Sequence, residues 1–162
     1  MTPAWEQATS LPAVLVAIGR AARGCSSPEV ARFRMDAERE ALALGRALRL
    51  SPGEPGAWTP RTGRRFLIRD PKPRTITAVP FRDRVVHHVV CAAAEPDFER
   101  FAVHHSYACR KGKGQHAAVR MAQRFAWAAP WVLKLDVAAF FASIPRDRLL
   151  RLVDRRVRVP EA

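Results

Sequence analysis

A single acidic residue at the end of an apolar run is the residue whose type and position best suit chemistry. Asp136 follows Trp131–Leu135, which predicts a β-strand, and precedes the aromatic pair Phe140 and Phe141. A carboxylate at a strand end can bind Mg²⁺, because this small, hard cation prefers oxygen ligands. An aspartate there also forms turns through its own backbone, so other motifs must separate the two interpretations.

Basic residues concentrate before Asp136, first in a predicted strand–loop–strand. The strands are expected near Arg65–Ile68 and Thr75–Val79, with Pro71 and Pro73 in the loop, because proline cannot donate within a paired ladder. An arginine guanidinium matches phosphate oxygens with its planar fork, and lysine adds a point charge. The segment therefore suits a polyphosphate, and a solvated hairpin face is the alternative. Its cationic residues are Arg64, Arg65, Arg69, Lys72 and Arg74.

A second basic motif opens a helix predicted over Phe81–Ala94, which Pro96 is expected to stop. An acid in the first turn, Asp83, is favourable to the helix dipole. Arg82 and Arg84 on either side of it have two interpretations: they contact nucleic-acid phosphate, or they pair internally with Asp83.

A short basic loop with two glycines precedes a helix predicted over Gln115–Ala128. Glycine lets backbone N–H groups approach an anion, and the helix N-terminus adds positive potential. The residue order is not that of a Walker phosphate loop. The cations of this loop are Arg110, Lys111 and Lys113.

Histidine and cysteine residues do not form a metal-ligand pattern. The adjacent histidines at 87–88 and 104–105 point to different sides, and the three cysteines have no C-x-x-C spacing. We therefore expect structural histidines and reduced thiols, which favour a cytoplasmic location. No run approaches the ~20 apolar residues that a membrane span needs, so no membrane partner is expected.

The charge is unevenly distributed. Residues 1–60 carry seven Arg against six Asp/Glu, whereas residues 61–162 carry 21 Lys/Arg against nine Asp/Glu, so twelve of the thirteen net positive charges lie in 61–162. A basic segment of this size favours a polyanion such as nucleic acid, which releases counterions on binding. An apolar fraction of 48% argues against disorder.

Helices are also predicted over 13–23, 28–50 and Arg146–Val157. Together with the strands, they indicate an α+β chain. Ser27 before Pro28 is a helix-start signal, with a hydroxyl cap and proline at the first helical position.

Taken together, residues 64–150 resemble a reverse transcriptase, an RNA-directed DNA polymerase, of the bacterial group II intron type. The similarity to enzymes of diversity-generating retroelements is carried by the runs Phe-Arg-Asp-Arg-Val-Val-His-His (81–88) and Ser-Tyr-Ala-Cys-Arg-Lys-Gly-Lys-Gly (106–114). The resemblance implies an incomplete right-hand polymerase fold. Residues 1–60 form an N-terminal helical region with a linker, 61–130 a fingers-like region, and 131–162 the first strand and helix of a palm.

The resemblance also implies roles for the basic and acidic residues. Asp136 is the catalytic ligand of Mg²⁺, helped by the Val137 carbonyl, and Phe141 lies under the nucleotide sugar and selects deoxynucleotides. Lys72 and Arg74, with Arg64, grip the incoming triphosphate. The residues expected to contact nucleic acid are Arg82, Arg84, Arg110, Lys111 and Lys113. The implied partners are template RNA, a DNA primer, deoxynucleoside triphosphates and a retroelement accessory protein.

The acidic half of the expected site has no counterpart in the sequence. A Tyr-x-Asp-Asp run is absent, and the acids after Asp136 are Asp147, Asp154 and Glu161. We therefore expect an N-terminal fragment of the polymerase that is inactive alone. The alternative is a non-catalytic RNA- or DNA-binding module.

Overall fold

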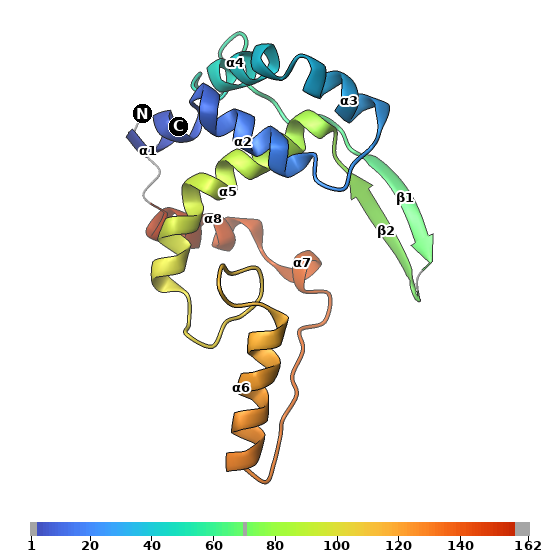
Figure 1. The fold of residues 1–162 in the computed structure, drawn as a ribbon, viewed down its shortest axis with the longest axis vertical. Coiled ribbons are helices and arrows are strands. Elements are labelled where there is room, and N and C mark those ends of the chain that lie inside the picture. The colour runs from blue at the N-terminus through green and yellow to red at the C-terminus, as the bar shows by residue number, and fades with distance from the viewer. Residues whose placement is uncertain (1–2, 70, 158–162) are drawn as a thin grey trace. The chain divides into compact units, whose positions relative to one another are not determined.

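The computed structural model describes residues 3–69 and 71–157 and combines helices with a two-stranded antiparallel sheet. This confirms the α+β class, whereas the fingers and palm assignments and the boundaries at 60 and 130 stay predictions. The described residues divide into two compact units that meet in the chain between Glu95 and Pro96. The elements in Figure 1 are α1 (Pro3–Ala8), α2 (Leu11–Ala21), α3 (Pro28–Met35), α4 (Ala37–Ala47), β1 (Arg64–Arg69), β2 (Pro73–Ala78), α5 (Phe81–Phe101), α6 (Gln115–Ala128), α7 (Phe140–Ser143) and α8 (Arg146–Arg156).

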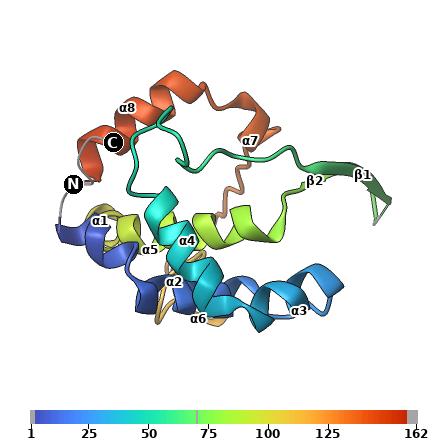
Figure 2. The same cartoon turned by 90° about the horizontal axis from the view of Figure 1, so that it is seen from above.

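The core of the first unit is formed by α2, α3, α4 and the first turns of α5, which gather in Figure 2. Val14, Leu44 and Phe81 are each 0% exposed. Phe33 of α3 packs edge-on against Phe81, with ring centroids 5.0 Å apart. Apolar side chains of α2, α3, α4 and the start of α5 thus meet in one core.

Close approach between α4 and the turn after α1 depends on Gly45. A Cβ at this position would lie 2.5 Å from the Thr9 carbonyl oxygen, so a larger side chain does not fit. Arg49 holds the same turn, because its Nη2 donates to the Thr9 carbonyl at 2.9 Å and its Nε to Thr9 Oγ1 at 3.0 Å. Thr9 is buried with its polar atoms satisfied.

Three predicted helix boundaries differ from the structure. The helix predicted over 28–50 is two helices, since the backbone leaves helical geometry at Asp36, where φ is −107° and ψ is 28°. The helix predicted over 13–23 lies at Leu11–Ala21. The predicted stop at Pro96 is wrong: α5 continues to Phe101, and its last turns are held by contacts of Glu99 described below.

In the hairpin, Pro73 is not in the loop but is the first residue of β2, a position that a two-stranded sheet tolerates.

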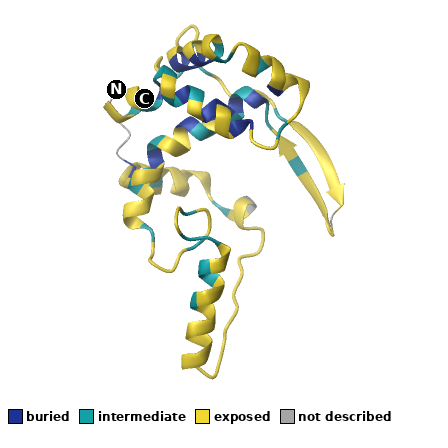
Figure 3. Ribbon diagram, viewed as in Figure 1, coloured by how far each residue is buried: buried dark blue, intermediate teal, exposed yellow. Residues whose placement is uncertain are grey.

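The second unit contains α6, α7 and α8. The predicted bounds of α6 are confirmed, and those of α8 differ by one residue at its end. The strand predicted over Trp131–Leu135 is wrong, because residues 131–137 have no strand assignment or pairing in the described structure. A strand needs a neighbouring backbone for its N–H and C=O groups, and the described residues supply none there. Leu133 is 80% exposed, and Figure 3 shows α6 and the segment after it mostly exposed.

Among the described helices, none combines the length and the apolar character that crossing a bilayer requires.

Candidate nucleic-acid interface

The β1–β2 hairpin carries the first group of predicted site residues on an exposed ribbon. Its antiparallel register pairs Arg64 with Ala78 at one end and Arg69 with Pro73 at the other. Five cationic side chains lie along it, and none forms an ion pair within the described residues. The Arg64 guanidinium stacks on Phe66, with Cζ 5.3 Å from the ring centroid. The exposed cations of the hairpin are Arg64, Arg65, Arg69, Lys72 and Arg74.

Both ends of the hairpin are fixed to the first unit by carboxylates. Before β1, the Arg61 backbone N–H donates to Asp83 Oδ2 at 2.9 Å, and the Trp58 indole N–H donates to Asp83 Oδ1 at 3.2 Å. After β2, the Phe81 backbone N–H donates to Glu29 Oε1 at 2.9 Å. Asp83 is 2% exposed, and both of its oxygens are satisfied, as a buried carboxylate requires.

The hairpin separates residues that the sequence analysis grouped together. Arg64 pairs with Ala78 at the open end of the hairpin, which we call its foot. Arg74 pairs with Ile68 near the other end, and Lys72 lies in the turn. Arg64 and Ile68 are four positions apart on β1, which is about 13 Å at a rise of ~3.3 Å per residue. Arg64 is therefore placed at the opposite end of the ladder from Lys72 and Arg74.

Arg84 and Arg82 do not pair with Asp83, so one of the two interpretations of this motif is not realised in the described structure. Arg84 Nη1 donates instead to Cys25 Sγ at 3.3 Å, and its Cζ lies 5.2 Å from the Phe81 ring centroid. The Nε atoms of both arginines are buried and without a hydrogen-bond partner in the described residues.

Arg84 and Arg20 place positive charge near His88. Burial lowers the pKa of His88, and the cations of Arg20 and Arg84 lower it further. The positive charges of Arg20 and Arg84 disfavour the protonated form of His88, and the same charges would favour a bound anion. The adjacent His87 is exposed.

In the second unit, the predicted basic loop uses one of its cations to hold itself. The Arg110 guanidinium forms a bidentate pair with Glu99 of α5, at 2.8 to 3.1 Å, and its Nη1 donates to the carbonyls of Val103 and Ser106. This pairing lowers the pKa of Glu99 and raises that of Arg110. The Arg110 side chain is 15% exposed, so its donors serve the loop.

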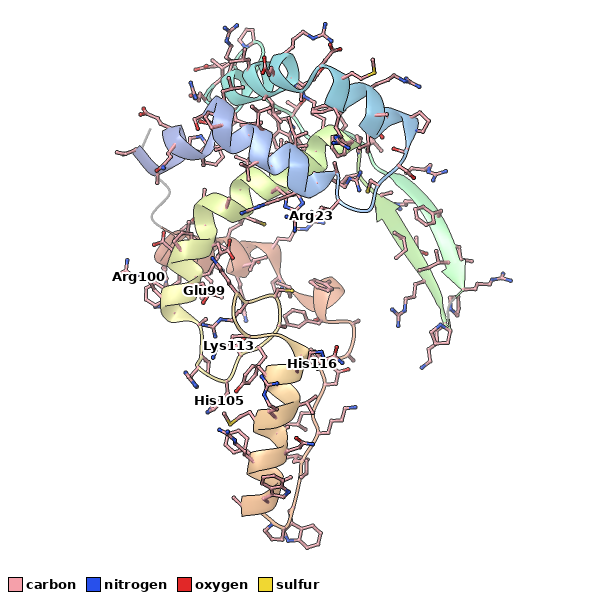
Figure 4. The ribbon with its side chains drawn as sticks, in the orientation of Figure 1. Arg23, Glu99, Arg100, His105, Lys113 and His116 are labelled. Carbon is pink, nitrogen blue, oxygen red and sulfur yellow. The ribbon has the colours of Figure 1, made fainter. Side chains whose placement is uncertain are left out.

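Lys113 and Gly114 are also engaged locally. Lys113 Nζ donates to the His104 carbonyl and lies 5.1 Å from the Tyr107 ring centroid. The Gly114 backbone N–H donates to the Tyr107 carbonyl at 3.0 Å. Figure 4 labels Lys113, Glu99 and His105 around this loop. Lys111 is the loop cation with an exposed side chain and with no hydrogen bond or ion pair within the described residues.

Asp136 is exposed, and its Oδ1 accepts from the Val137 backbone N–H at 3.0 Å. Phe141 is 91% exposed and stacks edge-on with Phe140, at 5.6 Å between centroids. Asp147 and Asp154 are exposed on α8, and Glu161 lies outside the described residues. Within the described ranges, no three His, Cys, Asp or Glu side chains cluster as metal ligands. Asp136 and Val137 alone do not form a Mg²⁺ site, because octahedral Mg²⁺ takes more protein or substrate oxygens than these supply.

The sequence analysis missed the positioning residues. The sequence analysis predicts Asp83 only as a helix-dipole acid and gives Glu29 no role, whereas each of them accepts from a backbone N–H of a segment distant in sequence. A local pattern carries no signal for such a contact. A comparison of the sequence with protein-family models and with curated proteins finds no match.

Proposed function

We propose that this chain belongs to an RNA-directed DNA polymerase of the reverse transcriptase type and that its part in that enzyme is to hold template RNA and DNA primer. The observation that carries the proposal is the β1–β2 hairpin, an exposed ribbon whose cations have no ion-pair partner in the described residues. A diversity-generating retroelement or group II intron enzyme is the finer assignment that the motifs at 81–88 and 106–114 favour.

The chemistry of the hairpin suits phosphate. Guanidinium groups that are not neutralised by carboxylates remain available to phosphate oxygens. The hydrogen bonds of Asp83 and Glu29 fix both ends of the hairpin, which lowers the conformational entropy cost of binding. Lys72 and Arg74 near the turn are proposed to contact the triphosphate of an incoming deoxynucleotide. Lys111 is proposed to contact the template strand.

Polymerisation itself is not expected from these 162 residues. They contain one candidate metal-binding carboxylate, Asp136, and no Tyr-x-Asp-Asp run. Primer extension by the purified chain should therefore be undetectable, and Asp136→Asn should leave that result unchanged. Joined to a segment that supplies the Tyr-x-Asp-Asp hairpin and the remaining palm strands, the chain should extend a primer, and Asp136→Asn should then abolish extension. Extension by the 162 residues alone, or by the joined enzyme with Asp136→Asn, would contradict these assignments.

The binding experiment titrates a fluorescent primer–template duplex at several salt concentrations. Each phosphate contact contributes about 0.7 to 0.9 to the slope of log affinity against log salt. We expect Lys111→Gln, at the proposed template contact, to lower that slope by about one. Lys72→Gln with Arg74→Gln, at the proposed triphosphate contacts, should leave the duplex slope nearly unchanged and should weaken binding of a deoxynucleoside triphosphate to the duplex complex.

The matched control removes two cations from the same unit, Arg32→Gln with Arg34→Gln on α3, where both side chains are exposed and unpaired in the described structure. It should leave both the duplex slope and the binding of the deoxynucleoside triphosphate nearly unchanged. A wild-type chain whose affinity does not depend on salt would contradict the proposal. Binding with the expected slopes, but without extension by the joined enzyme, would favour the non-catalytic module.

A further inference from the structure

A pocket of about 780 Å³ lies at the foot of the hairpin, within the first unit. It is bounded by the end of β2, the start of α5 and the beginning of α3. The volume is within the ~300–1,000 Å³ range typical of sites for small ligands. The polar and charged side chains that line it are Glu29, Thr62, Arg64, Thr77, Arg84 and His87.

The charge of this pocket is positive because its nearby acids are occupied elsewhere. Glu29 accepts from the Phe81 backbone N–H, and Asp83 accepts from Arg61 and Trp58. In the described residues, neither Arg64 nor Arg84 has a carboxylate partner. Two guanidinium charges therefore face one carboxylate.

Arg84 is positioned by packing, but its hydrogen-bonding capacity is not met. Its one hydrogen-bond acceptor among the described residues is the Cys25 thiol, which is a weak acceptor. Its Nε is buried and has no partner, and its guanidinium lies against the Phe81 ring. A half-buried guanidinium in this state is stabilised by an anion that accepts from it.

We propose that this pocket binds one backbone phosphate of a nucleic-acid strand, with Arg84 and Arg64 as its ligands and Thr77 as an additional donor. The proposal rests on the proposed function, and it deepens that function by separating Arg64 from the triphosphate contacts near the hairpin turn. Arg84 supplies a preorganised fork from the helix, and Arg64 supplies a second from the strand. The two arginines act on the same phosphate.

The test is a double-mutant cycle on binding of a labelled primer–template duplex. Arg84→Gln and Arg64→Gln should each weaken binding about tenfold, as expected for a charge-assisted hydrogen bond, and should each lower the salt slope by about one. Because one phosphate is lost in either case, the double variant should lower the slope by about one and not by two. The matched control, Arg32→Gln, should change affinity less than about twofold.

Two further measurements keep the outcome decisive. Thr77→Val, at an exposed strand position, should weaken binding while leaving the circular dichroism spectrum unchanged, which covers the case in which Arg84→Gln fails to fold.

Competition with inorganic phosphate and with a free deoxynucleoside triphosphate separates the sources of phosphate. If the pocket variants lose deoxynucleotide affinity but keep duplex affinity, the backbone assignment is overturned. If the duplex binds to the wild type and the pocket variants match Arg32→Gln, the pocket proposal fails while the proposed function stands. If the wild type binds no duplex, the proposed function fails.

Discussion

The two units of the chain each carry a basic segment, and the segments differ in whether acidic or basic side chains hold the backbone. At the hairpin foot, Glu29 and Asp83 bind backbone N–H groups, so acids hold the segment and arginines remain unpaired in the described structure. In the loop after α5, Arg110 binds Glu99 and two backbone carbonyls, so a cation holds the segment. The number of basic residues in a segment therefore does not tell how many can reach a ligand.

The units also differ in how their apolar side chains are covered. In the first unit, apolar faces of α2, α4 and α5 meet in a buried core. In the second unit, large apolar side chains such as Trp131 (87% exposed) and Leu135 (82% exposed) lack cover by the described residues. Stability measured on this chain should consequently report on the first unit.

The largest expected effect comes from the same substitution made once in each unit. Leu44→Ala removes a fully buried side chain and should lower the free energy of unfolding by about 2–5 kcal/mol. Leu133→Ala, at an 80% exposed position, should change it by less than about 0.5 kcal/mol. Urea denaturation followed by circular dichroism gives both values. Equal losses would show that residues 131–137 are covered in solution and would break the comparison.

A smaller effect, with opposite signs, is expected from two glycines of the first unit. Gly45→Ala places a Cβ against the Thr9 carbonyl and should destabilise the fold by about 1–3 kcal/mol. Gly19→Ala has open space and lies inside α2, so it should stabilise the fold by about 0.5–1 kcal/mol. Both follow from the same urea titration. Stabilisation by Gly45→Ala would contradict the close packing of α4 on the turn at Thr9.

The smallest expected effect is a pH dependence of the loop in the second unit. The Arg110 hydrogen bond lowers the pKa of Glu99 from its ordinary value of 4.5. The contribution of this pair is therefore complete above that ordinary value and is lost as the pH falls through the lowered pKa. The protection factors for amide hydrogen exchange of residues 102–114, which take the slower intrinsic exchange in acid into account, should therefore fall as the pH is lowered. Glu99→Gln should exchange faster at neutral pH and lose this acid response; an acid response retained in Glu99→Gln would assign it to another group.

Several elements were determined by local sequence. Ser27 caps α3, its Oγ accepting from the Val30 backbone N–H at 3.4 Å, because serine before proline at a helix start leaves few other conformations. The apolar spacing of Val30, Ala41 and Leu44 placed them in one core. The bounds of α6 and the existence of the hairpin were predictable for the same reason, since both depend on residues close in sequence.

Tertiary structure decided the rest, because the deciding partners lie far apart in the chain. α5 passes Pro96, and its last turns gain the Arg110–Glu99 pair, which joins residues eleven positions apart. Residues 131–135 have the composition of a strand but no partner to pair with in the described structure, and strand formation requires that second backbone. Asp83 is predicted as a helix-start acid, but in the structure it holds one end of the hairpin, because Trp58 and Arg61 donate to it from a segment more than twenty residues away. Sequence alone identified which residues carry charge; the fold decided which of them hold the backbone and which remain for a ligand.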